Sequence, residues 1–162
     1  MTTSRSESGL VPVIVDTREQ LPYSFDPQKI EIIRESLASG DYSLRGFEAR
    51  VTIERKTLSD FVASITQNRD RFWQEILRLT KFGRACVVIE ADFTDILAGR
   101  YRSNTHPNAV LGTILCINVD YSIPTYFCSD RASAQCFVEG YLIRAWKKLS
   151  VNMSKSDETD TK

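Results

Sequence analysis

The stretch GDYSLRGFEARVTIERK, residues 40–56, decides the fold of this chain. Its two halves, DYSLRGF and ARVTIERK, are typical of two strands joined at a short Arg-Gly turn. Because side chains alternate along a strand, the second half places Val51 and Ile53 on one face and Glu54 and Lys56 on the other. We therefore expect an apolar face in the core and, opposite it, a carboxylate beside an ammonium.

A second carboxylate belongs to the same stretch. If Asp41 heads the first of the two antiparallel strands, its side chain lies near Glu54, and the two charges repel unless a cation lies between them. Ligands that are all oxygen favour Mg²⁺ or Mn²⁺. Such an ion binds a phosphate oxygen and activates water, and Lys56 would orient that water or offset transition-state charge. The stretch thus contains the groups that phosphodiester hydrolysis requires.

The same residues also allow a simpler interpretation. An aspartate after a glycine is common in turns. A Glu-Arg-Lys run at the end of a strand is common at a solvated sheet edge. Residues 40–56 by themselves leave both interpretations open.

The rest of the chain alternates strand-like and helix-like segments. Apolar runs at 11–15 and 84–91 predict strands, and 29–37 predicts a further strand although its composition also fits a helix. Amphipathic or apolar segments predict helices after Thr57, over 71–82, over 107–119 with Asn104 or Thr105 as the cap, and over 131–149. The pattern predicts an α/β domain in which helices pack on a small mixed sheet. We expect a flexible lead over residues 1–10, one domain over 11–149 and a disordered polar tail over 150–162.

Composition limits the classes of protein. The 162 residues suffice for one domain, and 21 basic against 21 acidic residues argue against binding nucleic acid through bulk charge. The four cysteines form no C-x-x-C pair and lie in apolar stretches, so we expect reduced core residues. The polar start is no signal peptide and no run is long enough for a membrane span. We expect an intracellular protein without a membrane partner, cytoplasmic in a prokaryote or virus and nuclear in a eukaryote.

Three ordered blocks resemble the nuclease motif of the XPF-type structure-specific endonucleases: VDTRE (15–19), GDY (40–42) and IERKTLSD (53–60). Six residues match the G-D-x(n)-E-R-K-x-x-x-D motif of that family: Gly40, Asp41, Glu54, Arg55, Lys56 and Asp60. The helix expected over 68–79 and the strand over 85–92 are also similar to the family, so the resemblance covers residues 11–149. It implies a restriction-endonuclease-like fold and metal-dependent cleavage of DNA.

The resemblance also implies roles for individual residues. Asp41 and Glu54, with Asp16 as a further acid, would hold Mg²⁺ or Mn²⁺, and Lys56 would be the catalytic lysine. Glu19, Arg55 and Asp60 would support the site. Arg55 lies on the opposite strand face from Glu54, so we expect it to be a structural ion-pair partner. Asp60 is either such a support or a charge that complements the helix dipole.

Four basic residues are candidates for DNA contact: Arg69, Arg71, Arg78 and Lys81. Arg71, Arg78 and Lys81 share one face of the expected helix, which favours phosphate binding over an ordinary solvated face. His106, the single histidine, precedes Pro107 at a helix start, and we expect it at the surface.

The leading functional hypothesis is a Mg²⁺-dependent DNA endonuclease that acts on branched or flapped DNA in repair, recombination or processing of mobile DNA. A non-catalytic DNA-binding or scaffold subunit and a nuclease acting on RNA are the alternatives. Many family members carry a helicase or a helix-hairpin-helix domain that these residues do not contain. Three routes to DNA therefore stay open: a separate helicase or helix-hairpin-helix partner, dimerisation, or weak binding by this domain alone. The apolar residues of 107–119 and of the last helix predict a homodimer or heterodimer through these C-terminal helices.

Overall fold

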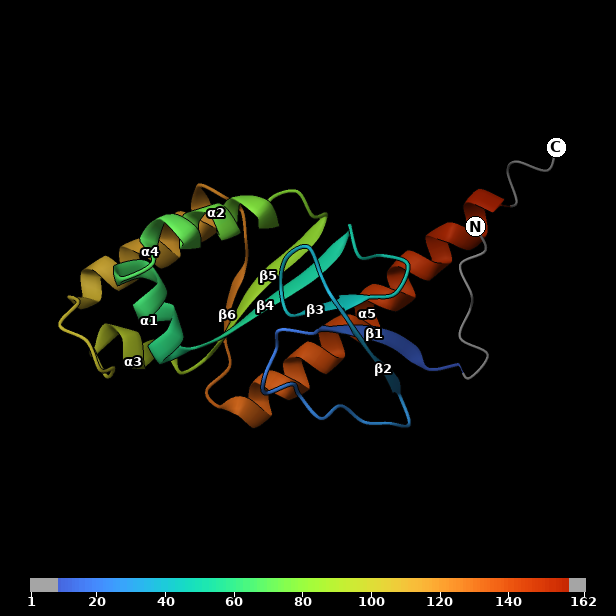
Figure 1. Ribbon diagram of the computed structural model, residues 1–162, viewed down its shortest axis with the longest axis horizontal. Helices are drawn as coiled ribbons and strands as arrows, with labels where there is room; N and C mark the ends of the chain where they lie inside the picture. The colour runs from blue at the N-terminus through green and yellow to red at the C-terminus, as the bar shows by residue number, and fades with distance from the viewer. Residues whose placement is uncertain (1–8, 158–162) are drawn as a thin grey trace.

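The computed structural model describes residues 9–157 and shows one mixed six-stranded sheet with helices on both faces (Figure 1). The strands, in sheet order, are β2 (Ile30–Glu35), β1 (Val11–Asp16), β3 (Tyr42–Leu44), β4 (Val51–Thr57), β5 (Arg84–Glu90) and β6 (Thr125–Phe127). The pairs β1–β2, β4–β5 and β5–β6 are parallel, and β3 pairs antiparallel with β1 and β4. This is the mixed restriction-endonuclease-like sheet that the sequence predicted.

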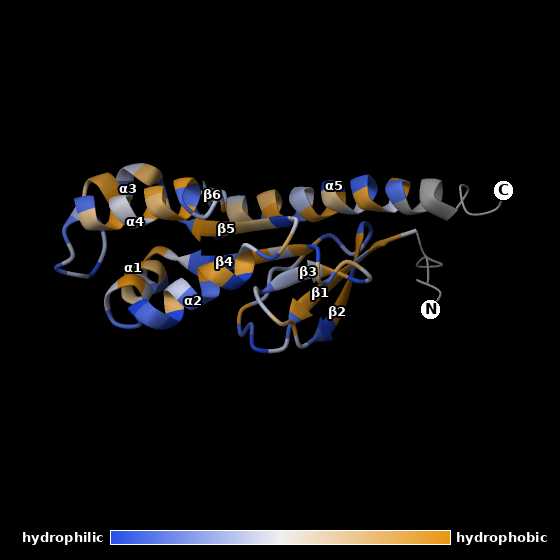
Figure 2. Cartoon of the chain, turned by 90° about the horizontal axis from the view of Figure 1, so that it is seen from above, coloured by the Kyte–Doolittle hydropathy of each residue, from blue (hydrophilic) through white to orange (hydrophobic). Residues whose placement is uncertain are grey.

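Two hydrophobic cores lie on the two faces of the sheet. The helices are α1 (Leu58–Thr66), α2 (Arg69–Leu79), α3 (Phe93–Leu97), α4 (Pro107–Val119) and α5 (Arg131–Asp157). In β5, Val87 packs with α1, α2 and α4, whereas Cys86 and Val88 pack with α5. Because both of its faces are covered, β5 is a continuous apolar run, drawn in orange in Figure 2.

Side-chain caps stand at several helix starts, and those of α1 and α4 bear on the predicted ones. Thr57 Oγ1 accepts a hydrogen bond from the backbone amide of Asp60 at 3.1 Å, which confirms the predicted cap of α1. The cap of α4 is His106 rather than Asn104 or Thr105. Its Nδ1 accepts from the amide of Asn108 at 3.2 Å, so the imidazole does here what a shorter polar side chain usually does.

The structure differs from the sequence-based expectation at the C-terminus. Instead of a disordered tail from Ser150, α5 continues to Asp157, and no proline or glycine interrupts residues 150–157. Most of the expected lead and the last five residues, 1–8 and 158–162, lie outside the described residues. In the amphipathic helix α2 the side chain of Leu77 is 55% exposed, although Leu77 is one residue from the buried Ile76.

The cysteines and the helices add two findings. All four cysteines are free, but Cys136 is exposed rather than part of the core. No helix within the described residues is long and apolar enough to cross a membrane.

Candidate active site

A cavity of about 300 Å³ opens between the sheet and α2 and brings together the polar residues of the 40–56 stretch. Asp41, Glu54 and Lys56 line it, with Asp16 from the end of β1 and Glu75 from α2. We call it the acidic cavity. Its walls come from segments far apart in the chain, so folding is what assembles it.

Asp41 reaches the cavity through the pairing of β3 with β4, in which Tyr42 lies opposite Ile53. The Asp41 amide donates to the Ile53 carbonyl at 2.8 Å, and Asp41 Oδ2 accepts from the Arg55 amide at 2.8 Å. The carboxylate is thus fixed beside β4, where the antiparallel arrangement predicted it, and Oδ1 is free of these bonds. Burial raises the pKa of Asp41 to about 6. The hydrogen bond from the Arg55 amide lowers this pKa, and the negative charge of Glu19 raises it further.

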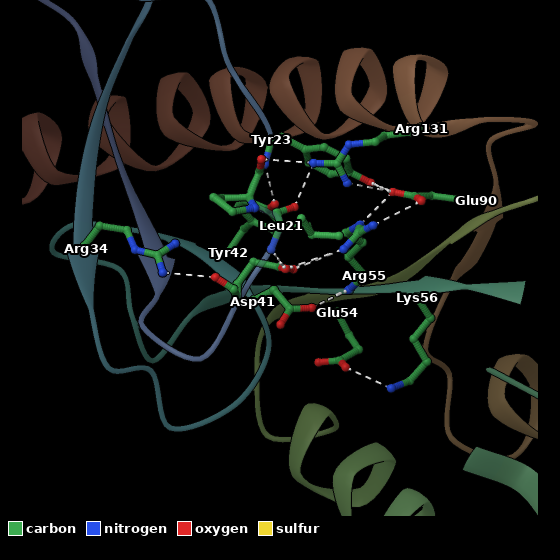
Figure 3. Close-up of polar contacts among 12 residues, drawn as sticks. Leu21, Tyr23, Arg34, Asp41, Tyr42, Glu54, Arg55, Lys56, Glu90 and Arg131 are labelled. Carbon is green, nitrogen blue, oxygen red and sulfur yellow. Dashed lines mark hydrogen bonds and ion pairs between the residues drawn. The ribbon is translucent and has the colours of Figure 1, made fainter. Parts of the chain in front are cut away.

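Glu54 and Lys56 project from β4 on the side opposite Arg55, as Figure 3 shows. Lys56 Nζ lies 3.1 Å from Glu54 Oε1 and 3.7 Å from Glu75 Oε2. Burial and the charge of Asp41 raise the pKa of Glu54 well above its usual range. Burial disfavours the Lys56 ammonium, but the carboxylates of Glu54 and Glu75 outweigh this and raise the pKa of Lys56.

The donor chemistry of the acidic cavity fits a hard divalent ion. Asp41 and Glu54 are adjacent carboxylates whose charge repulsion a cation would relieve. Within residues 9–157 no three His, Cys, Asp or Glu side chains converge closely enough to surround an ion. Mg²⁺ does not require such a cage, because it usually keeps several waters and takes one or two protein carboxylates.

Asp16 lines the same cavity, but its carboxylate is already occupied. Arg18 donates to Oδ1 from its amide at 2.8 Å and from Nε at 2.7 Å. Oδ2 accepts from Arg18 Nη2 at 3.1 Å and from the Leu37 amide at 2.7 Å. Burial opposes ionisation of Asp16, but these bonds outweigh it and lower its pKa. With four donors on its oxygens, Asp16 in this structure holds Arg18 and the 37–39 segment against the cavity instead of offering a free ligand atom.

Arg55 belongs to a separate network on the α5 side of the sheet (Figure 3). Its Nε and Nη2 lie 2.6 and 3.1 Å from the two carboxylate oxygens of Glu90, and Tyr23 Oη donates to Glu90 at 2.7 Å. Arg131, from the first turn of α5, donates to the carbonyl of Leu21 at 2.7 Å. The network ties the loop after β1 to β4, β5 and α5, so Arg55 is the structural ion-pair partner that its strand face predicted.

The two other predicted supporting acids lie outside the acidic cavity. Glu19 contacts Arg55 Nη1 at 3.4 Å and accepts from the Leu21 amide at 2.8 Å, which places it in the Arg55 network. Asp60 is in the exposed first turn of α1, where its charge complements the helix dipole.

The basic candidates separate by position. Arg71 and Arg78 line the acidic cavity, and Arg69 stacks over Trp73 outside it with 5.8 Å between its guanidinium carbon and the ring centroid. Lys81 lies beyond the end of α2. Arg71, Arg78 and Lys81 make no side-chain hydrogen bond or ion pair with any described residue.

Glu75 is the residue that the sequence did not single out. It follows Gln74 on a helix face that reads as solvated, and its contact with Lys56 depends on how α2 docks against β4. The one sequence signal is that the charged residues Arg71, Glu75 and Arg78 are spaced by four and three residues. This spacing places them on one face of the helix, and that face lines the acidic cavity.

Comparison with known proteins gives matches of three kinds: to a family model, to solved structures and to a sequence relative. The model of the ERCC4 domain family matches residues 15–139. Two structures of XPF from Aeropyrum pernix share the fold. The one in complex with DNA has a TM-score of 0.64 at 24% identity, over 85% of this chain and 66% of that one. The other has a TM-score of 0.63 at 23% identity, over 83% of this chain and 60% of that one.

A putative ATP-dependent RNA helicase of Methanocaldococcus jannaschii is 33% identical over 120 residues, which are 74% of this chain. The match spans 14% of the length of that relative.

Proposed function

The chain belongs to the ERCC4 domain family of XPF-type nucleases, and from that premise we propose that it is a Mg²⁺- or Mn²⁺-dependent DNA endonuclease. The observation that carries the proposal is the acidic cavity, in which Asp41, Glu54 and Lys56 meet. A scaffold subunit would not need the buried Glu54 and the partly buried Asp41 at a place where their carboxylates repel each other. The complete set therefore favours catalysis over the non-catalytic alternative.

In the proposed mechanism Asp41 and Glu54 hold the ion. When bound, the ion polarises a phosphate oxygen and lowers the pKa of a water molecule. Lys56, held 3.1 Å from Glu54, orients the attacking water and offsets negative charge that builds up on the phosphate. Asp16 is proposed as a positioning residue that keeps Arg18 at the mouth of the cavity.

Basic residues around the cavity are proposed to hold the DNA backbone. Arg71 and Arg78 have no acidic partner in the described part of the chain, so phosphate binding breaks no existing ion pair. Arg69 and Lys81 would extend this contact along α2. These contacts carry no base sequence information, which agrees with recognition of DNA shape.

We propose branched or flapped DNA as the substrate, in repair, recombination or mobile-DNA processing. The XPF structure in complex with DNA supports DNA over RNA. The relative named as a helicase supports a functional link with a strand-separating partner, and its RNA label keeps RNA as the competing substrate.

The test is cleavage of labelled fork, flap, plain duplex and RNA substrates in Mg²⁺ and in EDTA. We expect cleavage of branched DNA in Mg²⁺, none in EDTA, and none by Asp41→Asn, Glu54→Gln or Lys56→Ala. Cleavage within tenfold of wild type by any one variant would remove that residue from its role. Binding of DNA without cleavage by the wild type would favour the scaffold alternative.

Dimerisation through the C-terminal helices also remains a proposal. The fold buries more of these helices than their composition predicted, because Ile114 and Ile117 of α4 and Leu142 of α5 are core residues. Leu115 and Val119 of α4 and Val151 of α5 remain 52%, 72% and 54% exposed and are large apolar side chains left for an interface. Light scattering at tens of micromolar checks the mass; a monomer would count against the homodimer.

A further inference from the structure

A second cavity, of about 490 Å³, adjoins the acidic cavity beyond the C-terminal end of α2. Ala38, Ser39 and Arg78 line both cavities, so the two are neighbours that share a wall. We call the second one the side cavity. A strand held in the acidic cavity would meet the side cavity at these three shared residues.

The side cavity combines apolar walls with free positive charge. Its apolar walls come from Leu37, Ala38, Ala49 and Phe82. Arg78 and Lys81 stand at the same cavity with no hydrogen bond or ion pair to a described side chain. The acid that also lines it, Glu48, is compensated by the Gly46 amide at 3.0 Å and by Arg45 at 4.0 Å.

This combination points to a ligand with a flat apolar part and an anionic part. A nucleotide has both, and the volume is within the range of small-molecule sites. An aromatic ring such as Phe82 can contact any base through its π-face. Two unpaired cations can contact the flanking phosphates.

Resting on the proposed nuclease function, we propose that the side cavity receives one unstacked nucleotide of the strand being cleaved. Its base lies against Phe82 and its phosphates lie near Arg78 and Lys81. Taking a base out of a duplex costs free energy, and the cost is least where the strand is already unpaired. The side cavity would therefore give the enzyme a preference for an unpaired nucleotide at a fixed distance from the cleaved bond.

The experiment is a scan with abasic nucleotides. The cleavage position on a flap substrate is mapped first, and an abasic residue then replaces each of the nearest nucleotides on both sides of it. For the wild type we expect kcat/KM to fall about tenfold at one position, the order expected from loss of one base–aromatic contact. Phe82→Ala should cleave the intact substrate about tenfold more slowly than the wild type does. Placing the abasic residue at the sensitive position should then slow this variant little further.

A second variant protects the test against misfolding, because Phe82 also packs against the core. Ala49→Trp removes no atom and fills the exposed side of the side cavity. It should slow cleavage of the intact substrate more than cleavage of the substrate with the sensitive abasic position. Leu77→Ala, on the same helix but outside both cavities, is the control and should match the wild type on every substrate.

The outcomes separate the two proposals. If the effects of Phe82→Ala and of the lesion multiply independently at every position, the side cavity holds no base and the inference is overturned while the nuclease function stands. If the wild type cleaves no nucleic acid, the nuclease function itself fails and the inference fails with it.

Discussion

The backbone amide of Arg55 donates a hydrogen bond to Asp41 Oδ2 at 2.8 Å, and this bond joins the turn before β3 to the strand that carries Glu54 and Lys56. Because the donor is a main-chain group, the bond depends on the position of the Asp41 backbone rather than on the Arg55 side chain. That position in turn depends on Gly40. Gly40 has φ +79°, and a Cβ there would collide with Thr52 Oγ1.

We expect Gly40→Ala to lower the free energy of unfolding by about 2–4 kcal/mol, since it combines a left-handed backbone with a steric clash. The same change should abolish cleavage, because it displaces Asp41. Urea denaturation and the cleavage assay measure the two effects. Gly112→Ala is the matched control. Gly112 is in α4 with open space at its Cβ, so that change should be neutral or stabilise by up to about 1 kcal/mol. Equal stability of Gly40→Ala and wild type would contradict the steric argument.

The raised pKa of Asp41 predicts that removing its charge stabilises the protein when no divalent ion is added. The native carboxyl has a pKa of about 6 against the ordinary 3.8 of an aspartate, so the native state binds the proton more tightly. Ionising this carboxyl lowers the free energy of unfolding. The loss is absent below about pH 4 and complete above about pH 6. Asp41→Asn should therefore match the wild type at low pH and be about 2–3 kcal/mol more stable at pH 8 in EDTA.

Thermal melting from pH 4 to pH 8 tests this dependence. Added Mg²⁺ should raise the Tm of the wild type and leave that of Asp41→Asn unchanged, because binding to the native state alone shifts the equilibrium. If the wild type instead becomes more stable relative to Asp41→Asn as the pH rises in EDTA, the pKa of Asp41 is lowered rather than raised in the native state.

Glu75 is predicted to position Lys56. Glu75→Gln keeps the size of the side chain but removes one of the two carboxylates at the ammonium. We expect kcat to fall about tenfold, as for other residues that orient a catalytic group, with KM little changed. Glu75→Asp should restore part of the activity. Gln74→Ala, one residue away on an exposed part of α2, should behave as the wild type. An unchanged kcat in Glu75→Gln would exclude the positioning role.

Local periodicity explains what the sequence could predict. The alternation of β4 separated Glu54 and Lys56 from Arg55, because the period of a strand is a property of its own backbone. Asp41 could be placed beside them because β3 and β4 follow each other closely in the chain and pair antiparallel. Two contacts could not be predicted. The Leu37 amide reaches Asp16 from a loop 21 residues away, and Glu75 meets Lys56 only through the docking of α2.

The exposed Leu77 has the same explanation. A helical pattern gives the width of an apolar stripe, but the partner surface decides which edge of the stripe is covered. The packing of α2 against the sheet buries Phe72 and Ile76 and leaves Leu77 in solvent.

The last prediction concerns how a divalent ion affects DNA binding. The chain has equal numbers of acidic and basic residues, and four of its acids, Asp16, Asp41, Glu54 and Glu75, line one cavity. Four basic residues, Arg18, Lys56, Arg71 and Arg78, line the same cavity, so the repulsion is local. The carboxylates of Asp41 and Glu54 repel a phosphate that approaches the position of the ion. Ca²⁺ binds oxygen ligands as Mg²⁺ does but with looser geometry, so it should tighten DNA binding and support little cleavage. In EDTA the affinity should be weaker.

In both conditions the salt dependence of DNA binding should be shallow, because few unpaired basic residues are available to displace counterions. Titration of flap DNA in EDTA and in Ca²⁺ at several salt concentrations measures this, with Asp41→Asn as the variant in which the two affinities should converge. Equal affinities for the wild type in EDTA and Ca²⁺ would mean that the acidic cavity does not face the DNA.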